Sequence, residues 1–498
     1  MTRFLKNNWL IILVELLVIS AFCVLYGRYG DIYVDSFREA YISEQMLSGK
    51  LLYKNIFCIY PPLGYMINAL LFKFFGVSLK VLYFAGLFSA IGIFYFINKI
   101  CKKFFDNLIT SGILLFCTAG FVFSPNVFNP VFPYSYGMLY GLLFALISIY
   151  FALTKKFPLS YLFCSLAICS KIEFMLLLPA LIYLSKKESW RKNFILFILP
   201  FIVVIMIILL QGTEITDILT SLGLIQITGQ TDTIKEFYWS MGLIPTIHHI
   251  PLYLQNFLKF IFPFPYLIYQ EIATWIFPVS LVLFMFKRKK LSEAEIFFVL
   301  SSILVSLKVF FGLTMQSYGV FYLSFALISI CILLKGRLKK IFGIYLIVWA
   351  LIIGYNNSQI LIKKNFIISN EKGIVKVLPK DGKIISETIK FVDTLPNEAV
   401  VVIYPEELAV NYFTGRKSDD KFYSLIPLYT EVFGEETIIK RLEIKKPDYI
   451  IINDYNTFAY GFSKFGKDYA QNVMRYINDT YKKITPIETV HDILIYKK

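Results

Sequence analysis

Long apolar segments recur through this chain of 498 residues and restrict its fold more than any other feature. Segments such as 193–210 and 317–334 are dominated by apolar residues. A helix that crosses a bilayer needs about 20 such residues, because its backbone must satisfy its own hydrogen bonds inside the hydrocarbon. The composition agrees, with 57% hydrophobic residues, 17% charged residues and a mean hydropathy of +0.64. We therefore expect an integral membrane protein with many transmembrane helices.

The hydropathy pattern predicts eleven crossings. The segments 158–170 and 174–185 are short for separate crossings, and a single bent hairpin around residues 171–173 is the alternative. The helix count is least defined there and around 251–267. The first segment is too long for the apolar region of a signal peptide, so we interpret it as a retained anchor. The predicted spans are 9–27, 79–98, 108–124, 136–153, 158–170, 174–185, 193–210, 268–286, 294–312, 317–334 and 341–356.

The formal net charge of +16 comes from short basic clusters between the apolar segments, not from a stripe that would bind nucleic acid. Under the positive-inside rule these clusters mark cytoplasmic loops, which places the N-terminus in the cytoplasm and the C-terminus outside. The abundance of Lys, Ile, Phe and Asn indicates an AT-rich genome and favours a bacterial plasma (inner) membrane. The clusters are Arg3 and Lys6; Lys99, Lys102 and Lys103; Lys155 and Lys156; Lys186, Lys187, Arg191 and Lys192; 287–290; and Lys335, Arg337, Lys339 and Lys340.

The composition changes after about residue 358, where charged residues and turn signals replace the long apolar segments. The stretches 400–404 and 449–452 are typical of buried strands, and 383–394, 435–446 and 467–482 have helical periodicity. This alternation predicts a small extracytoplasmic α/β domain over 358–498, following a transmembrane module over 1–357.

Two external loops, 28–78 and 212–267, are longer than mere connections require. In the first loop, residues 36–47 have the apolar spacing of an amphipathic helix, and Pro61 and Pro62 break the chain before a second apolar stretch that ends at Gly76. We expect two interfacial helices that lie on the outer face of the membrane.

The first loop also carries three motifs: DSFRE at 35–39, GKLLYKNIF at 49–57 and YPPL at 60–63. Together they resemble the first external loop of the GT-C superfamily of membrane glycosyltransferases. The nearest branch is the family 39 type, which is similar to protein O-mannosyltransferases and lipid A aminoarabinose transferases. Further similar stretches are SKIEF at 170–174, Tyr318 with Gly319, and NYFTGR at 411–416.

The resemblance implies a glycosyltransferase that moves a sugar from a polyprenyl-phosphate donor to an acceptor hydroxyl on a protein, lipid or glycan. In that superfamily an Asp just after the first helix is the catalytic carboxylate, and Asp35 is the matching position. Many members carry Asp-Glu where this chain has Asp35 and Ser36, so the role of that Glu cannot be transferred. Glu39 and Asp31 are the other acids within reach.

This chemistry needs a base for the acceptor proton and positive groups for the departing phosphate. Asp35 is the expected base. Because Lys and Arg can hold a monophosphate, a divalent cation is compatible with the reaction without being required, and no cofactor is expected. The candidates for phosphate binding are Arg38, Lys171, Lys308 and Lys54, and those for the cavity or acceptor are Glu173, Tyr60, Tyr318, Tyr412 and Arg416.

Each candidate also has a purely structural interpretation. Ser36 and Glu39 fit a capping box at the start of a helix, with Asp35 as part of the same cap. Lys171 and Lys308 can be lysines that extend to the membrane surface from helix ends, and Lys54 can contact lipid headgroups. Packing of the α/β domain explains Tyr412 equally well.

Other functional classes remain alternatives. His248 and His249 are adjacent, so on a helix they diverge, and no carboxylate lies at the spacing of a metalloenzyme site; no metal site is predicted. A lipid-linked oligosaccharide flippase or transporter would also have many helices, but we find neither internal repeats nor matched helix breaks. A surface polysaccharide polymerase is chemically closer and would be expected to act through large external loops.

Overall fold

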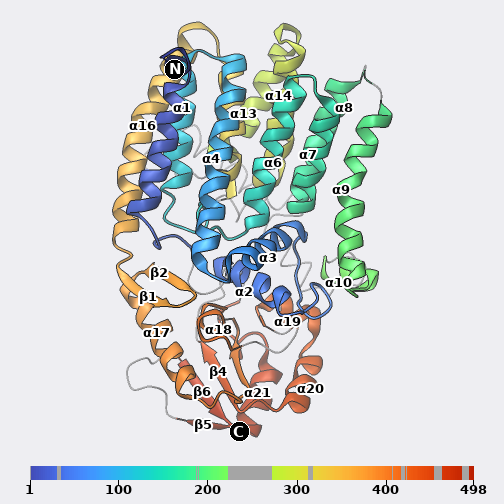
Figure 1. Ribbon diagram of the computed structural model, residues 1–498, viewed down its shortest axis with the longest axis vertical. Helices are drawn as coiled ribbons and strands as arrows, with labels where there is room; N and C mark the ends of the chain where they lie inside the picture. Colours follow the sequence, from blue (N-terminus) through green and yellow to red (C-terminus); the bar gives the residue numbers. More distant parts are fainter. Residues whose placement is uncertain are drawn as a thin grey trace.

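The computed structural model describes residues 2–30, 35–186, 188, 190–222, 272–311, 318–406, 408–416, 421, 423–453, 462–484 and 493–498. Within these ranges, the side chains of 2–8, 272–277, 308–311, 428 and 431–432 are not described. A bundle of long helices forms one end of the molecule and a smaller domain with a β-sheet forms the other, with α2 and α3 between them (Figure 1). The predicted fold class, a polytopic helical membrane protein with a C-terminal α/β domain, is confirmed.

Every predicted span coincides with a helix among the described residues. By length and composition, α4, α6, α9 and α16 are long and apolar enough to cross a membrane, and shorter apolar helices accompany them. The helices are α1 (Thr2–Val24), α4 (Leu79–Phe104), α5 (Asn107–Cys117) with the π-turn η1 (Thr118–Val122), α6 (Tyr136–Leu153), α7 (Phe157–Ser170), α8 (Leu178–Ser185), α9 (Trp190–Leu210), α13 (Ile272–Lys287), α14 (Glu293–Phe311), α15 (Gly319–Leu333) and α16 (Gly336–Ile362).

The short segments 158–170 and 174–185 form a hairpin. Helix α7 ends at Ser170, Lys171 is extended, and the 3₁₀ segment η2 (Ile172–Leu177) leads into α8. The hydroxyls of Tyr161 and Ser185 are hydrogen-bonded at 2.9 Å, so the start of α7 lies beside the end of α8. The chain therefore reverses at Lys171, inside the bundle.

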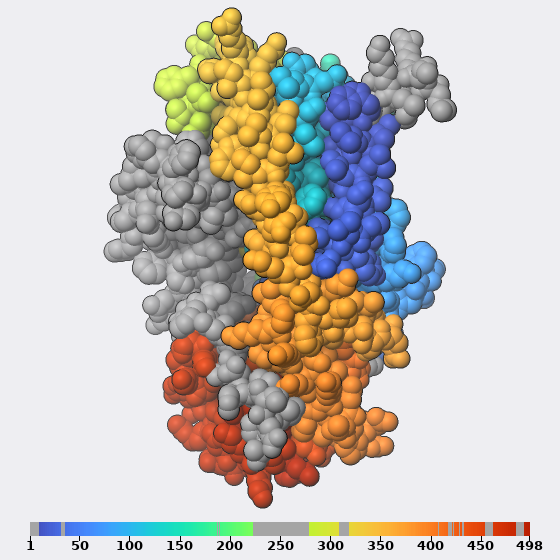
Figure 2. All heavy atoms as spheres, turned by 90° about the vertical axis from the view of Figure 1, so that its left-hand side faces the viewer, coloured from blue at the N-terminus to red at the C-terminus, as the bar shows by residue number. Residues whose placement is uncertain are grey.

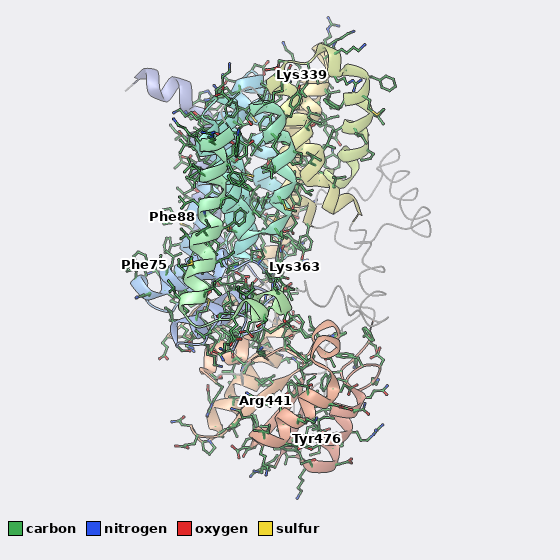
Figure 3. All side chains as sticks on the ribbon, turned by 90° about the vertical axis from the view of Figure 1, so that its right-hand side faces the viewer. Phe75, Phe88, Lys339, Lys363, Arg441 and Tyr476 are labelled. Atoms are coloured by element: carbon green, nitrogen blue, oxygen red, sulfur yellow. The ribbon has the colours of Figure 1, made fainter. Side chains whose placement is uncertain are left out.

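The basic clusters lie at the end of the bundle that faces away from the C-terminal domain. Figure 3 shows Lys339 there, far from Arg441 and Tyr476 in that domain. Neighbouring loops meet at this end: the ammonium of Lys339 lies 5.3 Å from the centroid of the Phe105 ring, and Lys287 donates a hydrogen bond to the Leu333 carbonyl at 2.5 Å. This clustering is what the positive-inside rule requires, while the side of the membrane stays a prediction.

The helices α2 (Asp35–Leu47) and α3 (Leu63–Phe75) differ in exposure. Leu70, Phe74 and Phe75 of α3 are more than half exposed, and Figure 3 shows Phe75 pointing away from the molecule, as expected for an interfacial helix. The position of α2 at the outer face of the membrane stays a prediction, but α2 is not an exposed helix. Most of its residues are buried, because the C-terminal domain covers the side that faces away from the bundle.

The C-terminal domain contains a mixed four-stranded sheet in the order β3-β4-β6-β5. The two predicted strands are β3 (Val401–Tyr404) and β4 (Tyr449–Asn453), which pair in parallel, while β6 (Ile493–Lys497) lies antiparallel between β4 and β5 (Lys482–Ile484). The predicted helices correspond to α17 (Pro379–Thr394), α20 (Glu435–Lys445) and α21 (Gln471–Thr480). Two short helices, α18 (Leu408–Thr414) and α19 (Pro427–Phe433), face the bundle.

Helix α16 continues past the apolar segment to Ile362 and leads into the hairpin of β1 (Phe366–Asn370) and β2 (Gly373–Val377), so the predicted boundary at residues 357 and 358 falls inside a helix. Figure 2 shows α16 beside α1, and it shows that the chain continues from α16 directly into the C-terminal domain. The hairpin is bonded to the bundle, since the Tyr83 hydroxyl donates to the Ile374 carbonyl at 2.9 Å and the Leu79 N–H to the Lys372 carbonyl at 2.8 Å.

Candidate active site

The connection between η1 and α6, residues 124–135, forms a compact support under the bundle. It is held by its own asparagines: Oδ1 of Asn129 accepts from the backbone N–H groups of Val131 and Phe132 at 2.9 and 2.8 Å, and Asn126 accepts from Ser124 at 2.7 Å. These local bonds give the segment a fixed shape without regular secondary structure.

Three side chains fasten the first turn of α2 to this segment and to the start of α6. Ser36 donates to the Phe132 carbonyl at 3.0 Å, Arg38 donates to the Tyr134 carbonyl at 2.9 Å, and Oε2 of Glu39 accepts from the Tyr136 N–H at 3.1 Å. All three residues are buried. The alternative that Ser36 and Glu39 form a capping box is therefore not what the structure shows, because both side chains are used across the fold.

Asp35 is the first residue of α2 and the exposed member of an ion pair. Its Oδ1 lies 3.1 Å from Arg38, and 38% of the Asp35 side chain is exposed against 7% of the Arg38 side chain. Arg38 is held from the opposite direction by the Tyr134 carbonyl, so it orients the carboxylate. Its Nε is buried and has no hydrogen-bond partner among the described residues, which leaves one donor unused.

The ring of Tyr60 contacts both Arg38 and a second cation, Lys171. The guanidinium carbon of Arg38 lies 4.8 Å from the centroid of the Tyr60 ring, and the ammonium of Lys171 lies 4.2 Å from it. Lys171 and Glu173 are 3.8 Å apart, with 5% and 8% of their side chains exposed. Buried charges inside a bundle are costly unless they are paired or bind a ligand. The turn between α7 and α8 places Lys171 and Glu173 close enough to pair. Two cations thus share one aromatic ring beside Asp35.

Glu39 is the deepest acid of the group. Its side chain is fully buried, and this burial raises its pKa to about 7, although Arg38 acts in the opposite direction. Near neutral pH, Glu39 therefore exchanges a proton directly behind the pair of Asp35 and Arg38. Sequence analysis had named Glu39 only as a nearby acid.

The C-terminal domain closes the site from the side opposite the bundle. The Tyr423 hydroxyl donates to the Phe57 carbonyl at 2.8 Å, and the ring of Phe57 packs edge-on against Tyr429 with centroids 4.8 Å apart. Lys372, in the turn of the β1-β2 hairpin, forms a 2.8 Å ion pair with Glu44 of α2. The connection between α1 and α4, which carries α2 and α3, therefore contacts the C-terminal domain as well as the bundle.

The structure brings together some of the predicted residues and separates others. Tyr318 belongs with the site, because its ring lies 4.8 Å from that of Tyr134, over which Lys171 also sits at 5.3 Å. Lys54 lies elsewhere, in an exposed 3.1 Å ion pair with Glu214. Asp31 and the side chain of Lys308 lie outside the described residues.

Two predicted residues of the C-terminal domain have structural contacts. Tyr412 is buried and packs edge-on against Phe37 of α2 with centroids 5.8 Å apart, so it forms part of the contact between the domains. Arg416 donates to the carbonyls of Asn397 and Leu395, at 2.6 and 2.9 Å, and so ties two loops of its own domain together.

Tyr134 and the support segment were missed by sequence reasoning. The available signal was a density of turn-forming residues, with Pro125, Asn126, Asn129, Pro130 and Pro133 in one short stretch. That signal marks an ordered turn, but it does not say which helix the turn holds.

No group of three or more His, Cys, Asp and Glu side chains among the described residues could hold a metal ion. His248 and His249 lie outside the described part of the chain. The expectation that no metal is needed therefore stays a prediction.

Comparisons with known proteins give a likeness to a solved structure. No protein-family model and no curated protein matches the sequence. Among solved structures, the chain is similar to ArnT from Cupriavidus metallidurans, a crystal structure with undecaprenyl phosphate bound, over 98% of each chain, with a TM-score of 0.49 and 10% identity. ArnT is a GT-C lipid A aminoarabinose transferase, the kind of protein that the first-loop motifs resemble.

Proposed function

We propose that this protein is a membrane glycosyltransferase that moves a sugar from a polyprenyl-phosphate donor to an acceptor hydroxyl at the outer face, with Asp35 as the general base. One observation carries the proposal: the exposed carboxylate of Asp35 adjoins a pair of buried cations, Arg38 and Lys171, that meet at the Tyr60 ring. A base next to a binding place for a phosphate is the combination that this reaction needs.

In the proposed step, Asp35 accepts the proton of the acceptor hydroxyl while the hydroxyl oxygen forms a bond to the anomeric carbon of the sugar. The bond between that carbon and the phosphate oxygen breaks, and the polyprenyl phosphate leaves with the electron pair. Arg38 and Lys171 stabilise the charge that develops on the phosphate, and the unused Nε of Arg38 is a donor for it. In this step the chain supplies the base, Asp35, and the two positive charges, Arg38 and Lys171.

The position of the site fits a lipid-linked donor. Asp35 lies where the helical bundle meets α2 and α3, and the exposed apolar side chains of α3 mark the level of the membrane surface. A prenyl chain that remains in the bilayer can present its phosphate at this level. The C-terminal domain, on the other side of α2, is then the surface that an acceptor approaches.

The test is transfer by the purified full-length protein in nanodiscs, supplied with a panel of radiolabelled polyprenyl-phosphate sugars and with acceptor-containing membrane extract. We expect Asp35→Asn to lower kcat by about 10²- to 10⁴-fold, the usual contribution of a general base, with donor affinity little changed. Asp106→Asn is the matched control. Asp106 caps the start of α5 by accepting from the Ile109 N–H at 3.2 Å, and Asn caps equally well, so this variant should keep full activity.

The outcomes separate the alternatives. Absence of transfer from every donor, or full activity in Asp35→Asn, would overturn the proposal. A larger loss in Glu39→Gln than in Asp35→Asn would move the role of base to Glu39. Movement of intact lipid-linked sugar across the bilayer without turnover would identify a flippase, and products that grow by repeated units would identify a polymerase.

A further inference from the structure

A second candidate binding place lies at the opposite end of the bundle, between the end of α8 and the start of α9 (Figure 1). It is a cavity of about 500 Å³, within the range of about 300–1,000 Å³ found for small-molecule sites. Tyr161 of α7 also lines it. None of the residues proposed for glycosyl transfer lines it.

The cavity wall has an apolar part and a polar part. Part of its wall is apolar and opens sideways, since Ile182 of the short apolar helix α8 and Phe194 of α9 are 55% and 54% exposed. Leu178 and Phe197 complete this apolar part. An opening of this kind faces lipid tails, so a hydrocarbon chain can enter from the bilayer.

The rim of the cavity is polar and mainly positive. Lys186, Trp190 and Asn193 line it, and the exposed Arg191 and Lys192 follow Trp190 on the first turn of α9. Glu188 is the acid at this rim. A Trp that is 68% exposed at the start of a membrane-crossing helix is typical of the headgroup level of a bilayer.

Asn193 supplies a polar side chain to the cavity wall. It is only 5% exposed and lines the cavity, so its amide can hydrogen-bond to a polar group bound there. It sits one turn into α9, where the backbone N–H groups at the start of a helix favour an anion.

We propose that this cavity binds one anionic glycerophospholipid of the membrane. One acyl chain lies against Leu178, Ile182, Phe194 and Phe197, and the phosphate of the headgroup lies at the first turn of α9, near Asn193 and the cations Lys186 and Arg191. The apolar part selects a lipid tail, and the positive rim selects a negatively charged headgroup over a zwitterionic one.

The probe is phosphatidylglycerol with a diazirine in one acyl chain, added at low mole fraction to phosphatidylcholine nanodiscs that contain the full-length protein. After illumination, mass spectrometry locates the adducts. We expect them to concentrate in the peptides of α8 and the first turns of α9. Unlabelled phosphatidylglycerol should compete more strongly than phosphatidylcholine, by roughly fivefold for each cation that contributes.

Matched variants test the two halves of the site. Ile182→Trp fills the cavity and should lower labelling by about fivefold or more, an affinity loss that corresponds to excluding part of one acyl chain. Ile202→Trp, at a 53% exposed position of α9 that does not line the cavity, should label as the native protein does. The double variant Lys186→Gln, Arg191→Gln should keep acyl labelling and lose the headgroup preference.

Even labelling of all lipid-facing helices, native labelling in Ile182→Trp, or equal competition by phosphatidylcholine would overturn the proposal. Size-exclusion profiles and Tm values show whether the variants fold. If Ile182→Trp does not fold, the competition measured on the unmodified protein decides the question.

Discussion

The ammonium of Lys171 lies 4.2 Å from the centroid of the Tyr60 ring. Tyr60 comes from the first external loop and Lys171 from the turn between α7 and α8, so this contact joins two distant parts of the chain. Arg38 lies 4.8 Å from the same ring, and the aromatic face therefore attracts both cations that we assign to the phosphate. The ring holds the two charges together in the absence of donor, when they would otherwise repel one another.

We expect Tyr60→Leu to weaken binding of polyprenyl phosphate about tenfold, because two cation–π contacts of roughly 0.5–1 kcal/mol each are lost. Tyr60→Phe keeps the ring and should stay within about threefold of the native protein. The measurement is the Kd for polyprenyl phosphate in nanodiscs. Tyr95→Leu is the control, since Tyr95 has a similar contact with Lys99 at 5.2 Å on another helix, α4. Equal losses in Tyr60→Phe and Tyr60→Leu would show that the ring face is not what matters.

Glu39 should make stability depend on pH in an unusual direction. Burial raises its pKa from 4.5 to about 7 in the folded protein, so the unfolded chain loses this proton first as the pH rises. Stability then falls between about pH 4.5 and 7, by roughly 3 kcal/mol in total, and is level above that range. Glu39→Gln, which retains an acceptor for the Tyr136 N–H, should remove this decline.

The Tm across this pH range is the measurement for Glu39. Glu443→Gln, an exposed position on α20, is the control and should follow the native curve. The same pH dependence in the native protein and in Glu39→Gln would mean that Glu39 does not titrate there.

Gly86 of α4 should be essential to the support segment. A Cβ at this position would lie 2.4 Å from the carbonyl oxygens of both Pro130 and Val131, so Gly86→Ala must push the segment away from α4. The displaced backbone is the one that holds Ser36, Arg38 and Glu39. We expect a stability loss of about 1–3 kcal/mol and a larger fall in kcat than in donor affinity.

Gly354→Ala is the matched control for Gly86, because it is also a helical glycine but its Cβ would meet only Ala119 at an ordinary 3.7 Å. It should be neutral or slightly stabilising, since Ala favours helices by about 1 kcal/mol over Gly. If both substitutions have the same effect on Tm and activity, the close approach of α4 to the support segment is not required.

The sequence predicted the parts of this structure that depend on local pattern. A crossing helix shows in about 20 consecutive residues, and the charges of Lys171 and Glu173 between two apolar segments marked the turn correctly. The grouping of Asp35, Arg38 and Glu39 on one turn follows from helical spacing. These features need no knowledge of distant residues.

The remaining features depend on contacts far apart in the chain. Ser36, Arg38 and Glu39 bond to backbone groups of residues 132–136, nearly a hundred residues away, and a backbone partner leaves no mark in the sequence. Likewise, α2 has the pattern of a surface helix, but the contacts of Lys372 with Glu44 and of Tyr423 with Tyr41 enclose it. A capping box was a reasonable local interpretation that tertiary contacts overrode.

The orientation in the membrane gives a final prediction. The basic loops lie at one end and the C-terminal domain at the other, so the positive-inside rule places that domain outside. Lys445→Cys, on the exposed face of α20, should react with a membrane-impermeant maleimide in intact cells, whereas Lys340→Cys, at the basic end, should react only after the membrane is opened. The native protein measures the background from its own cysteines, of which Cys23 is exposed on α1. The reverse labelling pattern would place Asp35 on the cytoplasmic side and exclude an acceptor on the outer face.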